Sequence, residues 1–285
     1  MIHTLAWATT RTARGRDDDE PPALAALAEL GVRVDVLDWD DPAARWASYD
    51  RVALRSTWDY ADRPAEFARW LEGVDGATEL VNPFGVVRWN LDKHYLAELA
   101  DAGVPTVPTV FVEPDGEFTP PGGAFVVKPA VGAGSRETAV YRPGQEERAG
   151  AHVRRLQARG EALLVQPLLA SVERDGEWPL VFLGGTYSHA ASKRVALPAS
   201  GTVEDLFASE TNTPHVASAA QLDVARAAAG AVADRFGPVA YARVDLVRDD
   251  AGEYRVLEVE LVEPSLFLTQ GGPDAARRLA RALAA

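Results

Sequence analysis

Short apolar runs and helical spacing alternate through the first third of the chain. The apolar runs predict strands at residues 4–8, 33–37, 51–54 and 79–82, and the spacing of apolar positions predicts helices at residues 22–30 and 64–71. Strands that alternate with helices are typical of an α/β unit with a parallel sheet. We therefore expect residues 1–88 to form an N-terminal α/β domain.

The middle third combines more strands with fewer helices. Residues 90–100 have the spacing of one helix, for which Asn90 is a suitable N-cap, and the helix is expected to end at Gly103. The pattern then predicts strands at residues 124–128, 137–141 and 162–166 and a helix at residues 145–159. We expect residues 89–170 to form a second, compact α/β lobe.

The last third contains two predicted hairpins. One turns at Gly184-Gly185, and the other spans residues 241–260. Helices are predicted at residues 217–235 and from Pro273 onward, and the stretch Pro198–Pro214 is expected to be flexible. We expect residues 171–285 to form a third lobe.

The hairpin at residues 241–260 carries opposed carboxylates. A two-residue loop at Ala251-Gly252 is the simplest register, and it places Asp245 opposite Glu258 and Arg243 opposite Glu260. Like charges in such positions destabilise a hairpin. A hard cation such as Mg²⁺ would offset them, so Asp245, Glu258 and Glu260 are candidate ligands. A solvated edge hairpin with an ion pair between Arg243 and Glu260 explains the same pattern.

A lysine followed by small residues indicates a phosphate site. Lys128 ends a predicted strand, and Gly132-Ala133-Gly134-Ser135 can bring backbone N–H groups against phosphate oxygens. The chain then returns as a strand rather than opening a helix, so neither the P-loop nor the dinucleotide fingerprint is met. A tight hairpin with an exposed lysine is the alternative interpretation.

An apolar strand that runs into a proline suits an adenine ring. The segment Gln166-Pro167-Leu168-Leu169 frees backbone groups beside apolar side chains. Glu173, Asp175 and Glu177 follow within reach of a ribose, and Glu177 is favoured because it begins the next predicted strand. A solvated acidic turn is the alternative for each of the three.

Two further segments carry candidate polar groups. Lys193 and Arg194 lie on a predicted strand after the Gly184-Gly185 turn, where either can face a phosphate. The loop Arg55-Ser56-Thr57-Trp58-Asp59-Tyr60 follows a strand of the first domain, which is where open α/β sheets bind ligands. Its arginine, two hydroxyls and two aromatic side chains suggest a polar small molecule. Solvent-facing basic residues and a surface loop are the respective alternatives.

The amino-acid composition argues against several kinds of functional site. The chain of 285 residues has no cysteine, and its five histidines show no paired ligand spacing, so disulfides, thiolate nucleophiles and zinc sites are not expected. A net charge of −13 argues against general nucleic-acid binding. We find no membrane-spanning run, signal-peptide pattern or Gly-x-Ser-x-Gly elbow, and we expect a cytoplasmic protein with no membrane partner; a homo-oligomer stays open.

Taken in order along the chain, these features resemble the ATP-grasp superfamily. The resemblance rests on Lys93, Lys128 with its glycine-rich hairpin, the Val165-Gln166-Pro167 strand, Asp245, and Glu258 followed by Glu260, and it covers residues 90–267. It implies an N-terminal α/β pre-ATP-grasp domain followed by two α+β lobes that clamp ATP.

The resemblance also implies a role for each candidate residue. The phosphates of ATP would contact Lys93 and Lys128 under the loop Gly132–Ser135, adenine would lie against Gln166–Leu169, the ribose would bind Glu177, and Asp245, Glu258 and Glu260 would hold Mg²⁺. The family usually has Asn where this chain has Glu260. That residue either ligates the metal or pairs with Arg243.

Two segments resemble a narrower group. Leu180–Arg194 and Glu258–Phe267 are similar to glutathione-synthetase-like ligases, and among these to the O-ureido-serine cyclo-ligases of cycloserine biosynthesis. The resemblance implies an ATP- and Mg²⁺-dependent carboxylate–amine ligase that forms an acyl phosphate on an amino-acid-like small molecule, with an internal or separate amine. The acyl phosphate would bind Arg243, Lys193 and Arg194, and the substrate would bind Arg55, Ser56, Thr57, Asp59 and Glu263. A small-molecule kinase and a non-catalytic nucleotide-binding module are the alternatives.

Overall fold

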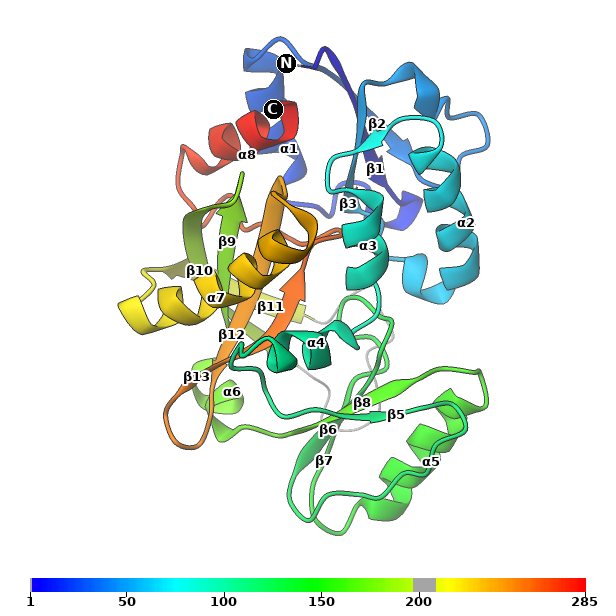
Figure 1. The fold of residues 1–285 in the computed structure, drawn as a ribbon, viewed down its shortest axis with the longest axis vertical. Coiled ribbons are helices and arrows are strands. Elements are labelled where there is room, and N and C mark those ends of the chain that lie inside the picture. Colours follow the sequence, from blue (N-terminus) through cyan, green and yellow to red (C-terminus); the bar gives the residue numbers. More distant parts are fainter. Residues whose placement is uncertain (1, 197–208) are drawn as a thin grey trace.

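The first lobe is built on a parallel sheet. A computed structural model describes residues 2–196 and 209–285 (Figure 1). Strands β1 (Thr4–Thr9), β2 (Arg33–Asp38), β3 (Arg51–Ser56) and β4 (Glu79–Leu80) form this sheet in the order β2-β1-β3-β4. Side chains alternate across β1, so Leu5 and Trp7 pack on one face while Ala6 and Ala8 pack on the other.

Helices cover both faces of this sheet. Helix α1 (Glu20–Glu29) and the C-terminal helix α8 (Ala275–Ala284) pack together on the face of Leu5 and Trp7. Helix α2 (Pro64–Asp75) packs on the opposite face, and α3 (Phe84–Asn90) leads out of the lobe. The α/β character predicted for the first domain is therefore confirmed, and the end of the chain returns to it (Figure 1).

The central lobe is a small antiparallel sheet. Strands β5 (Val110–Val112), β6 (Phe125–Pro129), β7 (Ala139–Tyr141) and β8 (Leu163–Pro167) have the order β5-β8-β6-β7. Helix α5 (Glu146–Gln157) buries Ala149, Val153 and Leu156 against the sheet. The short strand β5 was not predicted from the sequence.

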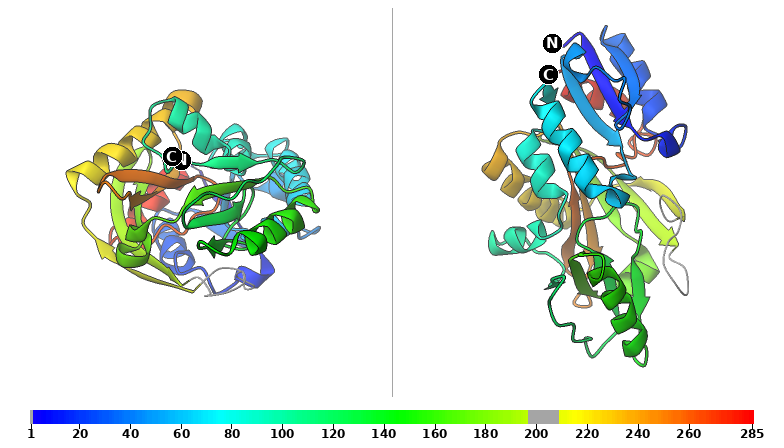
Figure 2. Two further views of the ribbon diagram at one scale, coloured as in Figure 1. Left: turned by 90° about the horizontal axis from the view of Figure 1, so that it is seen from below. Right: turned by 90° about the vertical axis from the view of Figure 1, so that its right-hand side faces the viewer.

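A five-stranded antiparallel sheet lies between these two lobes. Its order is β11-β10-β9-β12-β13, with β9 (Trp178–Leu183), β10 (Thr186–Ala196), β11 (Ser209–His215), β12 (Tyr241–Arg248) and β13 (Tyr254–Glu260). Helices α4 (Tyr95–Asp101) and α7 (Ala219–Phe236) pack on one face, and the short α6 (Ala170–Asp175) precedes β9. Figure 2 shows the first lobe at one end of the molecule and the central lobe at the other. The domain boundaries at residues 88 and 170 stay predictions.

The prediction of one helix at residues 90–100 is wrong. Asn90 is the last residue of α3, and a new helix, α4, begins at Tyr95. The reason is tertiary, because the buried amide of Asn90 donates to the carbonyl of Val259 (2.8 Å) and accepts from the N–H of Leu261 (2.7 Å). Asn90 therefore ties α3 to β13 instead of capping a helix.

The register of the hairpin is confirmed at the carboxylates and wrong at its turn. Asp245 pairs with Glu258, but the loop contains three residues, because Asp249 accepts its closing bond from Gly252 and donates to Glu253. Gly252 adopts the positive φ of 89° that such a loop requires at its last position. A register shift after Asp245 compensates for the longer loop.

The stretch predicted to be flexible divides into two parts. Residues 198–208 lie outside the described residues. The remaining part, residues 209–214, pairs with β10 as strand β11, so the prediction is wrong there. No helix within the described part of the chain is long and apolar enough to cross a membrane.

Replacement of Asn90 should destabilise the fold. Asn90→Ala leaves the carbonyl of Val259 in β13 and the N–H of Leu261 just beyond it buried without these partners, so we expect the free energy of unfolding to fall by about 2–4 kcal/mol. Urea denaturation followed by circular dichroism measures this loss. An unchanged midpoint would contradict the structural role of the Asn90 amide.

Candidate active site

A cavity of about 520 Å³ is lined by residues from all three lobes. Most of the candidates from the sequence line it, namely Lys93, Lys128, Gly132–Ser135, Gln166–Leu169, Glu177, Lys193, Arg243, Glu258, Glu260 and Glu263. Segments that are far apart in the sequence therefore meet at one site. The fold achieves this because β12 and β13 lie between the first and central lobes (Figure 1).

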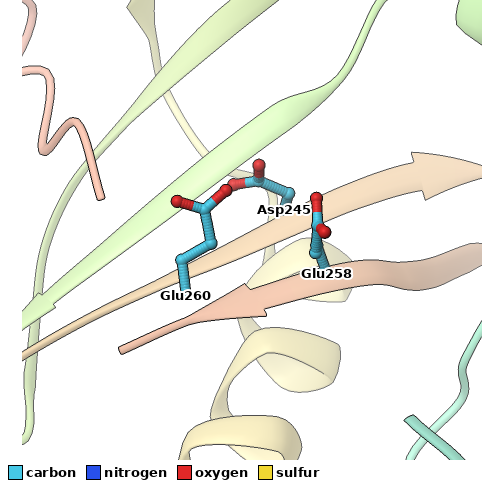
Figure 3. A group of neighbouring side chains, drawn as sticks. All are labelled: Asp245, Glu258 and Glu260. Atoms are coloured by element: carbon cyan, nitrogen blue, oxygen red, sulfur yellow. The ribbon is translucent and has the colours of Figure 1, made fainter. Parts of the chain in front are cut away.

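Three carboxylates gather on one face of the hairpin. Asp245 comes from β12, while Glu258 and Glu260 come from β13, and the three groups lie beside one another (Figure 3). One oxygen from each lies within 4.8 Å of one oxygen of the others. Asp245 is completely buried. Oxygen donors at this spacing fit a hard divalent cation such as Mg²⁺.

Two cations hold Asp245 in its charged form. Arg243 Nε donates to Asp245 Oδ1 at 2.7 Å and its Nη2 donates to Oδ2 at 2.8 Å, while Lys193 Nζ lies 3.2 Å from Oδ2. Burial raises the pKa of Asp245, but Arg243 and then Lys193 outweigh this effect, so the pKa lies below its ordinary value. The site therefore keeps a buried anion ionised.

Glu260 has the opposite electrostatic balance. Burial raises its pKa to about 7 even though Arg243 pairs with it, and repulsion from Asp245 and Glu258 acts in the same direction as burial. A bound divalent cation would relieve this repulsion. Glu260 thus contacts Arg243 and also belongs to the carboxylate cluster, so its position accommodates both roles that the sequence left open.

Two lysines reach the cavity from opposite directions. Lys93 lies in the break between α3 and α4, and its Nζ contacts Glu258 Oε1 at 3.0 Å and the carbonyl of Gly132 at 2.8 Å. Lys128 projects from β6, and burial followed by repulsion from Lys93 and Lys193 lowers its pKa below the ordinary value, although Glu258 opposes the shift. A phosphate oxygen placed here would stabilise the charged form of Lys128, which its surroundings disfavour.

The glycine-rich loop combines tight turns with anchors at its end. Gly134 and Ser135 have positive φ angles of 62° and 61°, which turn the backbone over the cavity. Arg136 forms an ion pair with Asp62 of the first lobe. Just beyond the loop, Glu137 binds Arg155 on α5 at 2.6 Å. The loop is therefore fixed between the first and central lobes.

The predicted adenine segment lines the far end of the cavity. Gln166 donates to the hydroxyl of Thr109 at 2.9 Å, and the N–H of Leu168 donates to the carbonyl of Ala124, also at 2.9 Å. The N–H of Leu168 is therefore already used within the protein. Glu177 pairs with Lys193 at 2.7 Å and lines the same cavity.

Several predicted residues lie outside the cavity lining. Glu173 pairs with Arg142 and Asp175 with Arg248, whereas Arg194 donates to the carbonyl of Arg174. The side chains of β10 alternate, so Lys193 and Arg194 point in opposite directions. Arg194 is therefore not placed to contact a ligand in this cavity.

Four of the five predicted substrate residues are also held away from it. Arg55 is fully buried and donates to the carbonyl of Pro264 at 2.8 Å. Ser56 bonds Thr9, Thr57 is buried, and Asp59 pairs with Arg63. None of these four belongs to the lining of the cavity, and Glu263 alone of the five lines it.

Other residues of the same loops line the cavity in their place. The lining includes Asp17, Arg136 and Phe267, which were not singled out from the sequence, and Trp58 and Tyr60, the two aromatic residues of the predicted substrate loop, which were not chosen as site residues. Trp58 and Tyr60 lie beyond the end of β3, where no regular alternation indicates which side chains face the cavity. Asp17 follows β1, and the rule that ligands bind beyond the carboxyl ends of parallel strands would have found it.

Comparisons with known proteins agree with this architecture. The family model described as the N-terminal domain of the D-cycloserine synthetase DcsG matches residues 5–82. Over 293 residues the chain is 40% identical to the cycloserine biosynthesis protein DcsG of Streptomyces lavendulae, with 98% of this chain and 97% of that protein covered.

Solved structures extend the comparison to the whole fold. The crystal structure of the D-cycloserine synthetase DcsG aligns with a TM-score of 0.92 at 40% identity, covering 99% of this chain and 98% of that one. The D-alanine–D-alanine ligase of Bacillus anthracis complexed with ATP aligns with a TM-score of 0.69 at 13% identity, covering 99% and 96% of the two chains. The second likeness concerns the fold alone.

The charge cluster predicts unequal effects for two neighbouring basic residues. Lys193→Met removes a buried partner of Asp245 and Glu177, so we expect the free energy of unfolding to fall by about 3 kcal/mol. Arg194→Met, one position along β10, removes an exposed contact and should change it by less than about 0.5 kcal/mol. Urea unfolding of both variants checks this, and equal losses would contradict the arrangement.

Proposed function

The chain belongs to the family of the D-cycloserine synthetase DcsG and is an ATP-dependent ligase with the ATP-grasp fold, and from this premise we propose that it closes the cycloserine ring of O-ureido-serine. The new bond is an amide between the carboxyl carbon of the substrate and the nitrogen attached to its side-chain oxygen. The amine is thus internal, and no second amino acid is required.

One observation carries the proposal. Cations and carboxylates meet at a single cavity beneath a glycine-rich loop: Lys93, Lys128, Arg243, Glu258 and Glu260 line it, and the fully buried Asp245 lies outside the lining but in the same carboxylate cluster. Cations complement the phosphates of ATP, and a carboxylate cluster complements a divalent cation that would neutralise them further. Activation of a carboxylate by phosphoryl transfer needs both.

The reaction requires positioning rather than a protein nucleophile. A carboxylate oxygen of the substrate attacks the γ-phosphorus of ATP, ADP leaves, and an acyl phosphate results. The nitrogen then attacks the acyl carbon, its proton departs, and inorganic phosphate leaves. Cycloserine carries no carbamoyl group, so water must also cleave the bond between that group and the nitrogen of O-ureido-serine: the nitrogen takes a proton, and the carbamoyl group leaves as carbamate, which breaks down to carbon dioxide and ammonia. We assign Arg243 and Lys193 to the charge of the acyl phosphate.

We further propose that the carboxylate cluster binds Mg²⁺. The donors are Asp245, Glu258 and Glu260, whose oxygens converge within 4.8 Å. The raised pKa of Glu260, which burial brings to about 7, supports a cation at this position, because a bound cation would favour the ionised form. When bound, the cation would supply positive charge to the phosphates of ATP.

A product assay tests the proposed function. Both enantiomers of O-ureido-serine are incubated with ATP and MgCl₂, and ADP and the organic products are measured by chromatography and mass spectrometry. We expect one ADP for each ring formed with one enantiomer, and no ADP after EDTA treatment. Accumulation of a stable phosphorylated substrate without ring closure would show that the protein is a kinase rather than a ligase. ADP release with other amino-acid derivatives but not with O-ureido-serine would refute the substrate.

Glu258 should be essential for turnover. Glu258→Gln removes a cluster carboxylate and the partner of Lys93, so we expect kcat to fall on the order of 10²-fold or more while the melting temperature stays within a few degrees. Steady-state ADP release and thermal unfolding measure the two effects. Full activity in this variant would contradict the assignment of Glu258 as a Mg²⁺ ligand.

Glu260→Asn supplies the matched comparison. Asparagine is the usual family residue at this position, and its side chain keeps an oxygen donor while removing the charge that burial disfavours. We therefore expect kcat within about tenfold of the parent protein. A loss as large as that of Glu258→Gln would mean that the carboxylate of Glu260 is itself required.

A further inference from the structure

Where the first lobe lines the cavity, one carboxylate has an oxygen that no described residue binds. Asp17 follows β1, lines the cavity and is only 6% exposed. Its Oδ1 accepts the N–H of Asp19 at 3.0 Å, whereas its Oδ2 is buried and has no hydrogen-bond partner among residues 2–196 and 209–285. Buried carboxylate oxygens are costly when they are not hydrogen-bonded. A ligand donor would remove this cost.

The charges around Asp17 show what kind of donor is missing. Burial raises its pKa to about 6, although Arg55 opposes the shift, and Asp19 and Glu20 add negative charge nearby. Arg55 lies 3.6 Å from Asp19, donates to the carbonyl of Pro264 and does not line the cavity. Its charge offsets part of the negative charge, but it makes no hydrogen bond to the open oxygen of Asp17, so a donor from the ligand is what that oxygen lacks.

Asp17 and Arg243 flank the same short segment. The carboxylate of Asp19 accepts the N–H groups of Leu266 and Leu268, which fastens the loop of Asp17 to this segment. Arg243 donates to the carbonyl of Ser265 in the same segment at 3.0 Å. The cavity lining thus includes an anion from the first lobe and a cation from β12 that are both connected to one short segment.

Glu263 is the competing carboxylate in this part of the cavity. Burial raises its pKa to about 8, and Glu260 adds to the shift. This direction favours the neutral form of Glu263, which attracts an ammonium weakly. Asp17, by contrast, has a buried oxygen with no hydrogen-bond partner among the described residues, so it is the group that a ligand ammonium would complete.

We propose that Asp17 binds the α-ammonium group of the substrate and makes the site specific for zwitterionic amino acids with a free amino group. The inference rests on the proposed function, because it needs a substrate whose carboxylate faces Arg243. The ammonium then donates to the open oxygen of Asp17, while the carboxylate lies at the cationic end. Substrates without the amino group leave Asp17 buried and unpaired, which penalises their binding.

Asp17→Asn tests the proposal without removing the internal bond to Asp19. The asparagine carbonyl oxygen still accepts that N–H, so the loop should keep its shape. Asp18→Asn is the matched control, since it makes the same change of charge at the next position, which lines the same cavity but is exposed to solvent. Calorimetry in the presence of ADP and Mg²⁺ gives the affinities of O-ureido-serine and of its desamino analogue for each protein.

We expect the parent protein and Asp18→Asn to prefer the amino compound by on the order of 10²-fold, as a charged hydrogen bond warrants. In Asp17→Asn this preference should shrink to a few-fold, with affinity lost for the amino compound only. An unchanged preference in Asp17→Asn, or no preference in the parent protein, would overturn the role of Asp17.

The binding experiment is independent of turnover. A preference that depends on Asp17 supports the proposal even if no cycloserine forms, in which case the proposed reaction alone fails. Conversely, the parent protein could close the ring while its Asp17→Asn variant keeps the full preference. That result would support the proposed reaction and show that Asp17 does not recognise the amino group. Thermal unfolding of each variant verifies that the comparison is made between folded proteins.

Discussion

Arg243 and Asp245 form a buried ion pair on β12, two residues apart on the same face of the strand. Burial penalises both charges, and only their mutual contact, with Lys193 and Glu260 beside them, makes the arrangement tolerable. A slip of one residue between β12 and β13 would turn Glu258 and Glu260 away from this cluster. The register of the hairpin and the charge balance of the site therefore depend on each other.

The same sheet also holds the lobes together. Asn82, at the end of the first sheet, donates to the carbonyls of Tyr241 and Leu261, and the hydroxyl of Tyr241 donates back to Leu54 and Val262. These are backbone groups that no regular ladder uses. The amide of Asn82 and the hydroxyl of Tyr241 thus replace the missing ladder partners where a parallel sheet meets an antiparallel one. These hydrogen bonds fix the position of the first lobe relative to the five-stranded sheet, and both contribute walls of the cavity.

The sequence predicted what local patterns determine and missed what tertiary contacts determine. Alternation of apolar residues predicted the strands of the first lobe, and an assumed two-residue turn predicted the pairing of Asp245 with Glu258. The strands and the pairing are confirmed, although the turn itself is wrong. Asn90 carried a valid capping signal, but its amide bonds to β13, a partner that no local pattern reveals. The turn at Gly252 was missed for another reason, because a later bulge absorbs the extra loop residue and leaves the same pairing at the site.

The substrate side was less predictable for a related reason. The loop after β3 was chosen correctly, but packing decides that Arg55 enters the interior while Trp58 and Tyr60 line the cavity. Asp62, which ends the same loop, pairs with Arg136 of the glycine-rich loop. The wall that faces the substrate is therefore tied to the loop that lies over the phosphate site. Any rearrangement of one loop must strain or break this ion pair unless the other follows, so the two parts of the cavity are mechanically linked.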